Sequence, residues 1–162
     1  MKKTIIALLA LLTISSAAVA ADSIAFGVRA GGEIGSNNQI DRNTEFYEGF
    51  GDLYLNRLVS IGATLAYSAA DHKSFGSIRR DESYPLTALF KVHVPIPFFQ
   101  PYAGLGQAFI LHNHRSSTGS PVAFAGADIS PLPIPLFLNI EYRHQFNGGD
   151  LDFLAGGVGV KF

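Results

Sequence analysis

Apolar and polar residues alternate along most of this chain with a period of two, which is the side-chain period of a β-strand. The last twelve residues show the alternation most clearly. Their two faces consist of Leu154, Gly156, Val158, Val160 and Phe162, and of Phe153, Ala155, Gly157, Gly159 and Lys161. One face is therefore apolar, and the other is made of small or polar residues with one aromatic ring.

The same alternation, interrupted by clusters of Gly, Pro, Asn, Asp and Ser, predicts eight strands. These are residues 23–34, 44–55, 59–69, 82–94, 101–112, 121–130, 136–146 and 151–162. Eight strands of about ten residues and seven connections of about eight require roughly 136 residues. Removing the first 20 of the 162 residues leaves 142, so these elements account for almost the whole remaining chain. The pattern predicts an all-β fold, an eight-stranded antiparallel up-and-down barrel.

Two of the predicted strands do not show at once which face is inner. In 101–112, Gln107 interrupts one apolar face and His112 ends the other. In 121–130, an inward Asp128 leaves a weakly apolar outer face of three alanines and Ile129. We expect that arrangement because a lipid-facing carboxylate would cost more than a weak apolar face.

The predicted connections alternate in length. Residues 35–43, 70–81 and 113–120 are longer and polar, whereas 56–58 and 131–135 are short. An even number of strands places both termini at one end, with short turns in the periplasm and long loops outside the cell. Two connections depart from this pattern: 147–150 is short for an outer loop, and 95–100 is long for a periplasmic turn.

The polar faces favour a membrane barrel over a soluble one. An outer-membrane barrel presents apolar residues outward and fills a narrow interior with small residues and a few charges. Four positive and four negative residues fall on the polar faces, and this balance is expected where an unpaired buried charge would be costly. The residues predicted to form this ion network in the lumen are Arg29, Glu48, Asp52, Lys91, Asp128, Glu141, Arg143 and Lys161.

The first segment of the chain is typical of a bacterial signal peptide. Met1-Lys2-Lys3 is basic, residues 5–12 are apolar, and Ala18-Val19-Ala20 is a small-residue cleavage site. We expect residues 1–20 to be removed and residues 21–162 to form the barrel in the outer membrane of a Gram-negative bacterium. The chain has no Cys, which excludes lipid attachment after residue 20, a disulfide framework and thiol catalysis. A net charge of −1 gives no basic surplus for nucleic acid.

Three stretches carry a family resemblance. They are the alternating strand that ends at Phe162, the segment Gln100-Pro101-Tyr102-Ala103-Gly104-Leu105-Gly106, and Glu141-Tyr142-Arg143. The chain resembles the small eight-stranded bacterial outer-membrane barrels of the OmpX, OmpW and OmpA-transmembrane type. The resemblance implies that the barrel-assembly machinery reads Phe162 as an assembly signal. It does not specify an activity, since such barrels include adhesins, small channels, lipid enzymes and structural proteins.

A more distant resemblance is to the lipid A deacylase barrels, which carry His-x-Ser on a late strand together with an acidic residue that orients the His. The matching stretch here is His144-Gln145-Phe146-Asn147, so Phe146 stands where the nucleophilic Ser would be. The other His-x-Ser, His114-Arg115-Ser116, falls in a predicted outer loop. No catalytic residue is therefore predicted, and a lipid A hydrolase is the disfavoured alternative.

Histidines and cations gather toward the predicted outer end. A metal site would need three or four convergent ligands, and solvated loop histidines are the simpler reading of His72, His112, His114 and His144. We predict no metal or other cofactor. The basic residues predicted to contact lipopolysaccharide phosphates are Lys73, Arg79, Arg80 and Arg115.

The resulting leading hypothesis is an outer-membrane barrel with an ion-paired interior and a structural or surface-interaction role through its outer loops. Its expected partners are outer-membrane lipid, lipopolysaccharide and the assembly machinery, and we expect a monomer. A narrow channel for small or apolar solutes is the second hypothesis, and a lipid A-modifying hydrolase is the third.

Overall fold

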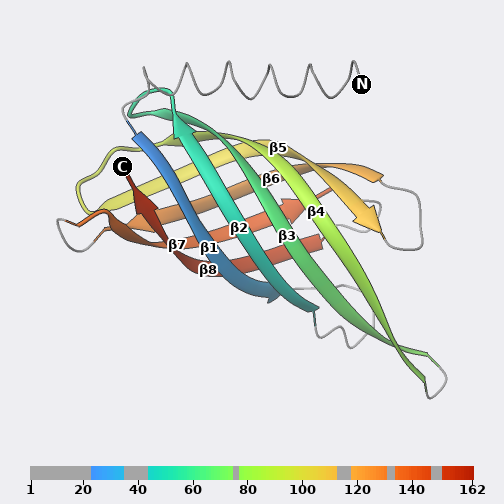
Figure 1. Ribbon diagram of the computed structural model, residues 1–162. Coiled ribbons are helices and arrows are strands. Elements are labelled where there is room, and N and C mark those ends of the chain that lie inside the picture. Colours follow the sequence, from blue (N-terminus) through green and yellow to red (C-terminus); the bar gives the residue numbers. More distant parts are fainter. Residues whose placement is uncertain (1–22, 35–43, 75–76, 113–117, 131–133, 147–150) are drawn as a thin grey trace, which may run out of the picture.

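A computed structural model describes residues 23–34, 44–74, 77–112, 118–130, 134–146 and 151–162 as one closed barrel (Figure 1). Every strand is antiparallel to its neighbours in sequence, and β1 closes the barrel against β8. The strands are β1 (Ser23–Glu33), β2 (Thr44–Tyr54), β3 (Val59–Ser74), β4 (Ser77–His93), β5 (Phe99–His112), β6 (Thr118–Ile129), β7 (Leu136–Gln145) and β8 (Leu151–Lys161). The predicted fold class is confirmed. The predicted signal peptide lies outside the described residues.

Burial follows the predicted alternation. Along β7, exposed and buried residues alternate without interruption apart from the half-exposed His144. In β5, the face that carries Tyr102 and Ile110 is buried, and the face that carries Leu105 is exposed. In β6, Asp128 is buried and Ile129 points outward. Both strands whose faces were difficult to assign from sequence therefore present apolar side chains to the outside.

Large inner side chains pack over glycines of neighbouring strands. A side chain at Gly104 would collide with the ring of Phe124, and one at Gly126 would collide with Tyr102. This pairing of large with small residues lets rings fill a narrow barrel. The inner apolar side chains form three clusters, which contain Leu89, Tyr102, Ala108, Val122 and Phe124; Ala25, Phe50, Tyr54 and Phe137; and Phe46, Ala66, Phe153 and Ala155.

The prediction of a loop over residues 70–81 is wrong. Pairing of β2 with β3 ends at Thr44 and Ala70, but β3 and β4 go on pairing with each other as far as Ser74 and Ser77. The hairpin projects beyond the other strands at the lower right of Figure 1. The polar composition of this segment does not end the strands, because the two strands still satisfy each other's backbone groups. We call residues 71–74 and 77–82 the outer hairpin.

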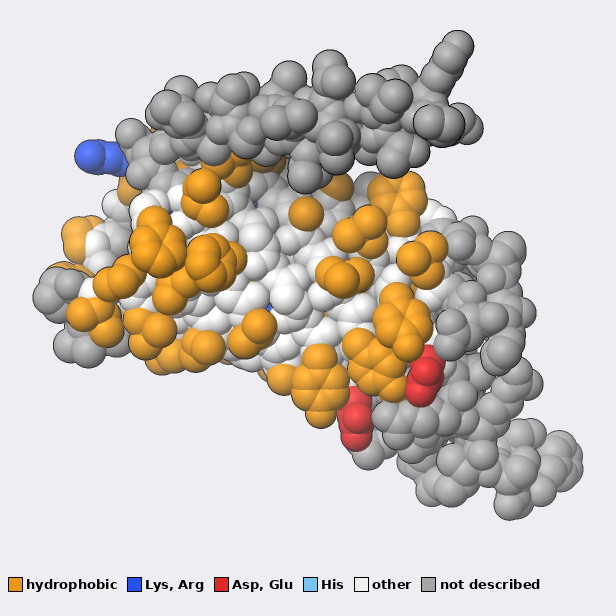
Figure 2. Space-filling view, viewed as in Figure 1, with side chains coloured by type: hydrophobic (Ala, Val, Ile, Leu, Met, Phe, Trp, Pro, Cys, Tyr) orange, Lys and Arg blue, Asp and Glu red, His pale blue; other side chains and the backbone are white. Residues whose placement is uncertain are grey.

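The outer surface is apolar, with aromatic rings toward both ends. Exposed aromatic residues toward the end of the outer hairpin are Tyr47, Tyr84, Phe109, Tyr142 and Phe146. Those toward the end at which β1 begins and β8 ends are Phe26, Phe90, Phe98, Phe99 and Phe162. Figure 2 shows apolar side chains over one side of the barrel, with charged side chains toward its ends. Such a band with aromatic girdles matches the surface of a barrel embedded in lipid. None of the described residues forms a helix that is long and apolar enough to cross a membrane.

Candidate functional site

Four charged side chains form a closed ring in the middle of the lumen. Arg29 Nε donates to Glu48 Oε1 at 2.6 Å, and Arg29 Nη1 lies 2.6 Å from Glu141 Oε2. Arg143 completes the ring, with Nη1 at 2.8 Å from Glu48 and Nη2 at 2.7 Å from Glu141. Each carboxylate therefore binds both guanidinium groups, and the ring is neutral.

Strand register explains why these four residues meet. Arg29 of β1 and Glu48 of β2 lie directly opposite each other, while Glu141 and Arg143 share the inner face of β7. The four side chains are at most 7% exposed. Buried ions with this degree of pairing stabilise the barrel only as a complete set, since removing one member leaves uncompensated charge.

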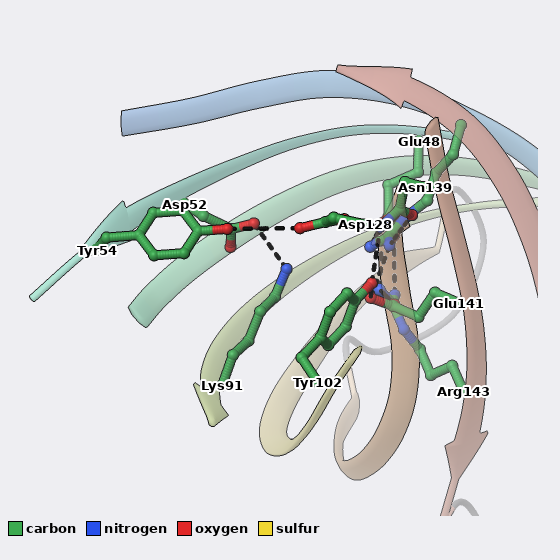
Figure 3. Close-up of polar contacts among 10 residues, drawn as sticks. Glu48, Asp52, Tyr54, Lys91, Tyr102, Asp128, Asn139, Glu141 and Arg143 are labelled. Atoms are coloured by element: carbon green, nitrogen blue, oxygen red, sulfur yellow. Dashed lines mark hydrogen bonds and ion pairs between the residues drawn. The ribbon is translucent and has the colours of Figure 1, made fainter. Parts of the chain in front are cut away.

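Tyrosine and asparagine side chains extend this ring across the lumen (Figure 3). Tyr102 donates its hydroxyl to Glu141 at 2.9 Å, and Asn139 Nδ2 donates to Tyr102 and to Asp128 at 2.8 Å each. The hydroxyl of Tyr54 lies 3.4 Å from Asp128 Oδ2. Since Tyr54 is on β2 and Asp128 is on β6, this contact joins opposite walls of the eight-stranded barrel.

The two lysines of the lumen are held by rings as well as by polar groups. Lys91 Nζ donates to Asp52 Oδ2 at 2.7 Å and lies 4.9 Å from the ring centre of Tyr102. Lys161 Nζ lies 3.7 Å from the ring centre of Tyr54 and donates to Gln100 at 3.3 Å. Of the eight charged residues predicted for the lumen, six lie in ion pairs, while Asp128 and Lys161 lie in hydrogen bonds.

Sequence reasoning did not select the neutral members of this site. Tyr54, Tyr102 and Asn139 link the charged residues, and His93 Nε2 lies 2.8 Å from Ser60 Oγ between the rings of Tyr54 and Tyr102. The period-of-two rule places Tyr54, Ser60, His93 and Asn139 on the polar faces of their strands, whereas Tyr102 lies on β5, whose inner face only the structure identifies. The alternation along each strand could have identified these four residues as candidates for the interior. It does not indicate which side chains on opposite sides of the barrel contact each other.

His144 lies on the outer surface beside an acidic residue. Its Nδ1 lies 2.7 Å from Asp152 Oδ1, which also accepts a hydrogen bond of 2.6 Å from the hydroxyl of Tyr142. The ring of Phe146 stands edge-on to the His144 ring, with centroids 4.4 Å apart. An oriented imidazole is thus present, and an aromatic side chain occupies the place of the expected nucleophile. Ser116 lies outside the described residues.

The structure describes only some of the residues that were considered as metal ligands or predicted to contact lipopolysaccharide. The backbones of His72 and Lys73 lie on β3, those of Arg79 and Arg80 lie on β4, and that of His112 ends β5. In the outer hairpin, Arg79 is opposite His72 and Arg80 is opposite Asp71. His114 and Arg115 lie outside the described residues. Among the residues that the structure describes, no three His, Asp or Glu side chains gather as a metal ion would require.

Phe162 completes the joint between the first and last strands. Its backbone exchanges two hydrogen bonds of 2.9 Å with Ile24, and its ring stacks on Phe26 with centroids 5.8 Å apart. The side chain is 68% exposed on the outer surface. It is therefore accessible at the end of the barrel where β1 begins and β8 ends.

Residues 7–162 match the family described as the outer membrane protein beta-barrel domain. The chain belongs to this family. The expected resemblance to small outer-membrane barrels and the location in the bacterial outer membrane are therefore confirmed. None of the curated proteins matches the sequence.

Solved structures of outer-membrane barrels share the fold. Ail, the attachment invasion locus protein of Yersinia pestis, is 17% identical with a TM-score of 0.57, over 86% of this chain and 97% of Ail. OprG of Pseudomonas aeruginosa is 15% identical with a TM-score of 0.62, over 88% of this chain and 96% of OprG. Neisserial surface protein A is 14% identical with a TM-score of 0.59, over 86% of this chain and 97% of that protein. At these identities the likeness establishes the fold of this outer-membrane barrel, not its activity.

Proposed function

We propose that this outer-membrane barrel is a closed, monomeric protein that acts through its outer surface, with lipopolysaccharide as its partner. The observation that carries the closed lumen is the set of polar contacts that cross it, above all Tyr54 to Asp128 and the ring of Arg29, Glu48, Glu141 and Arg143. In this proposal the barrel-assembly machinery reads Phe162, and the protein has no catalytic residue.

The crossing contacts argue against a role as a channel. A solute that passed through the lumen would have to separate buried ion pairs, and each unpaired ion in a low-dielectric interior costs several kcal/mol. The rings that pack over Gly104 and Gly126 occupy the space beside these pairs. The interior is therefore suited to holding the wall together.

Planar bilayer recordings test the closed lumen. We expect a flat baseline for the native protein. The double substitution Glu141→Ala and Arg143→Ala removes one charge of each sign from the same face of β7 and is expected to produce measurable current steps, because it empties the centre of the ring. Current steps from the native protein would contradict a closed barrel and support the narrow-channel alternative.

The outer hairpin is the proposed lipopolysaccharide contact. It extends beyond the strands on either side, and its sequence carries Lys73, Arg79 and Arg80. Arg115 is the fourth proposed contact. Guanidinium groups bind phosphate oxygens in a bidentate manner, so this composition suits the phosphates of lipopolysaccharide.

Binding of lipopolysaccharide to the barrel in nanodiscs tests this contact. The double substitution Arg79→Gln and Arg80→Gln is expected to weaken binding about thirtyfold, since a cation near an anionic membrane surface contributes about 1 kcal/mol. Arg57→Gln is the matched control, because Arg57 is an exposed cation in the turn at the opposite end of the barrel. Equal affinity of the native protein, the double variant and the Arg57→Gln variant for lipopolysaccharide would contradict a role of the outer hairpin in binding it.

One specific observation favours the hydrolase alternative, and it is the geometry of His144. Asp152 orients the imidazole as an acidic residue does in a catalytic triad. Phe146 offers no hydroxyl to attack an acyl chain, so we expect expression of the protein to leave the mass spectrum of cellular lipid A unchanged. Loss of an acyl chain that depends on His144 would contradict this expectation.

A further inference from the structure

An apolar groove runs over the outer surface of the barrel from β8 across β1 and β2 to β3, and Leu86 of β4 and Leu136 of β7 line its edges. Its volume is about 530 Å³, and exposed side chains such as Phe26, Val28 and Leu65 form its walls. Gly49, Gly51 and Ala63 lie between these walls and form the floor. In Figure 2 a pale strip of backbone and non-apolar side chains separates apolar side chains on this side of the barrel.

The packing of the barrel does not require glycine in this floor. A Cβ atom at Gly49 would meet nothing within 4 Å, and one at Gly51 would meet only the carbonyl oxygen of Ala25, at 4.0 Å. The inner glycines differ, because a Cβ at Gly104 would lie 2.5 Å from the Phe124 ring. Glycine inside a strand weakens the strand and often marks a place where another molecule approaches the backbone closely. At these two positions the free space is on the lipid side.

The groove lies in the half of the barrel that ends at the short β2–β3 turn, which is the end that the loop lengths place in the periplasm. Gly49 is five residues before the end of β2 at Tyr54. With a rise of about 3.3 Å per residue and a strand tilt of about 40°, this is a depth of about 13 Å. Half of a hydrocarbon core of about 30 Å is about 15 Å. On β2 the groove is lined by residues 49–51, so it lies within the depth of one acyl layer, between the middle of the hydrocarbon core and the β2–β3 turn.

A cation stands at the periplasmic end of the strands that form the floor. The turn between β2 and β3 is fixed by Asn56, whose Oδ1 accepts hydrogen bonds from the backbone N–H groups of Leu58 at 2.7 Å and Val59 at 2.9 Å. Leu55 and Leu58 are 47% and 52% exposed, and Arg57 between them is also exposed. Exposed leucines beside a cation suit the boundary between hydrocarbon and headgroups. Arg57 is thus placed at the level of lipid phosphates.

We propose that this groove and Arg57 together bind a phospholipid of the periplasmic leaflet. One acyl chain lies over Gly49, Gly51 and Ala63, and the phosphate lies at the Arg57 guanidinium. The groove is continuous with the lipid-facing surface, so hydrocarbon is the medium that covers it. Its depth and the charge of Arg57 select a phospholipid of that leaflet, since lipid A would have to enter from the opposite end.

The absence of Trp from the chain provides a clean reporter. Phe26→Trp places a single fluorophore in the groove wall, and Phe90→Trp places one on an exposed site of β4 that does not line the groove. Both proteins are reconstituted in phosphatidylcholine vesicles that contain phosphatidylglycerol brominated in its acyl chains, which quenches a nearby Trp. We expect the relative affinity for the brominated lipid to be about fivefold higher at the Phe26→Trp site, as one additional cation–phosphate contact implies.

Two further substitutions test the two parts of the site. In the Phe26→Trp protein, Gly49→Leu fills the groove and Arg57→Gln removes the cation, and each is expected to lower the affinity to the level of the Phe90→Trp site. Gly156→Leu is the matched control on the outer face of β8, where a Cβ has the nearest contact, Asn139 O, at 3.9 Å; it should change nothing. A gel shift between unheated and boiled samples verifies that each variant is folded.

Four results would overturn the proposal. The first is equal quenching at the two Trp sites, and the second is an equal effect of Gly49→Leu and Gly156→Leu. The third is stronger competition by lipid A than by phosphatidylglycerol at the Phe26→Trp site. The fourth is quenching that disappears as the density of the protein in the vesicles rises, which would assign the groove to a second copy of the chain.

Discussion

Replacing Glu48 with alanine is expected to lower the free energy of unfolding of the barrel by about 3–5 kcal/mol. Glu48 accepts ion-pair contacts from both Arg29 and Arg143, and its side chain is fully buried. Without it, two guanidinium groups in the lumen share one remaining carboxylate, that of Glu141. Urea titration of the folded barrel in detergent, followed by the gel shift between unheated and boiled samples, measures the change.

A matched carboxylate on the same strand serves as the control. Glu45 is exposed on the opposite face of β2, and Glu45→Ala is expected to change stability by less than about 1 kcal/mol. A double variant, Glu48→Gln with Arg143→Met, restores the charge balance and should lose less stability than the sum of its single substitutions. If Glu48→Ala were as mild as Glu45→Ala, the ring would contribute little to holding the barrel closed.

Gly104→Ala is expected to destabilise the barrel by about 3 kcal/mol although it adds only one methyl group. The new Cβ would press against the carbonyl oxygen of Phe90 and lie 2.5 Å from the ring of Phe124. The carbonyl belongs to the strand ladder and cannot move aside, and the Phe124 ring is buried among the inner aromatic residues. The same urea titration measures the loss.

Gly49→Ala is expected to raise the free energy of unfolding of the barrel, whereas Gly104→Ala lowers it. Its Cβ would enter open space on the lipid side, and replacing glycine by alanine inside a strand is worth about 0.5 kcal/mol. Equal destabilisation by the two substitutions would show that glycine is needed in these strands for a reason other than inner packing.

Strand positions were predictable because the period of two is a local property of the sequence. The limits of β1, β2, β7 and β8 agree with the predicted segments to within one residue at each end. The outer hairpin was not predicted, since the polarity of residues 70–81 contains no information about strand pairing. β3 and β4 pair there because each offers the other a complete set of backbone partners.

The candidate site was predictable only as a list of inward charges. The parity of each strand places Arg29, Glu48, Glu141 and Arg143 on inner faces, and their balance suggests that they neutralise one another. Whether Glu48 binds Arg143 depends on how β2 and β7 face each other across the lumen. That relation is set by strand tilt and shear in the closed barrel, which no single strand encodes.

The sequence by itself determined the fold class, the membrane-facing surface and the set of buried charges, because alternation and turn residues act over a few residues and the charge balance follows from the composition of the polar faces. Only the tertiary structure decided which charges pair, which rings close the lumen, where the β3–β4 hairpin projects, and that Gly49 and Gly51 face a groove. These features depend on distances between strands far apart in sequence, and closure of the barrel alone fixes those distances.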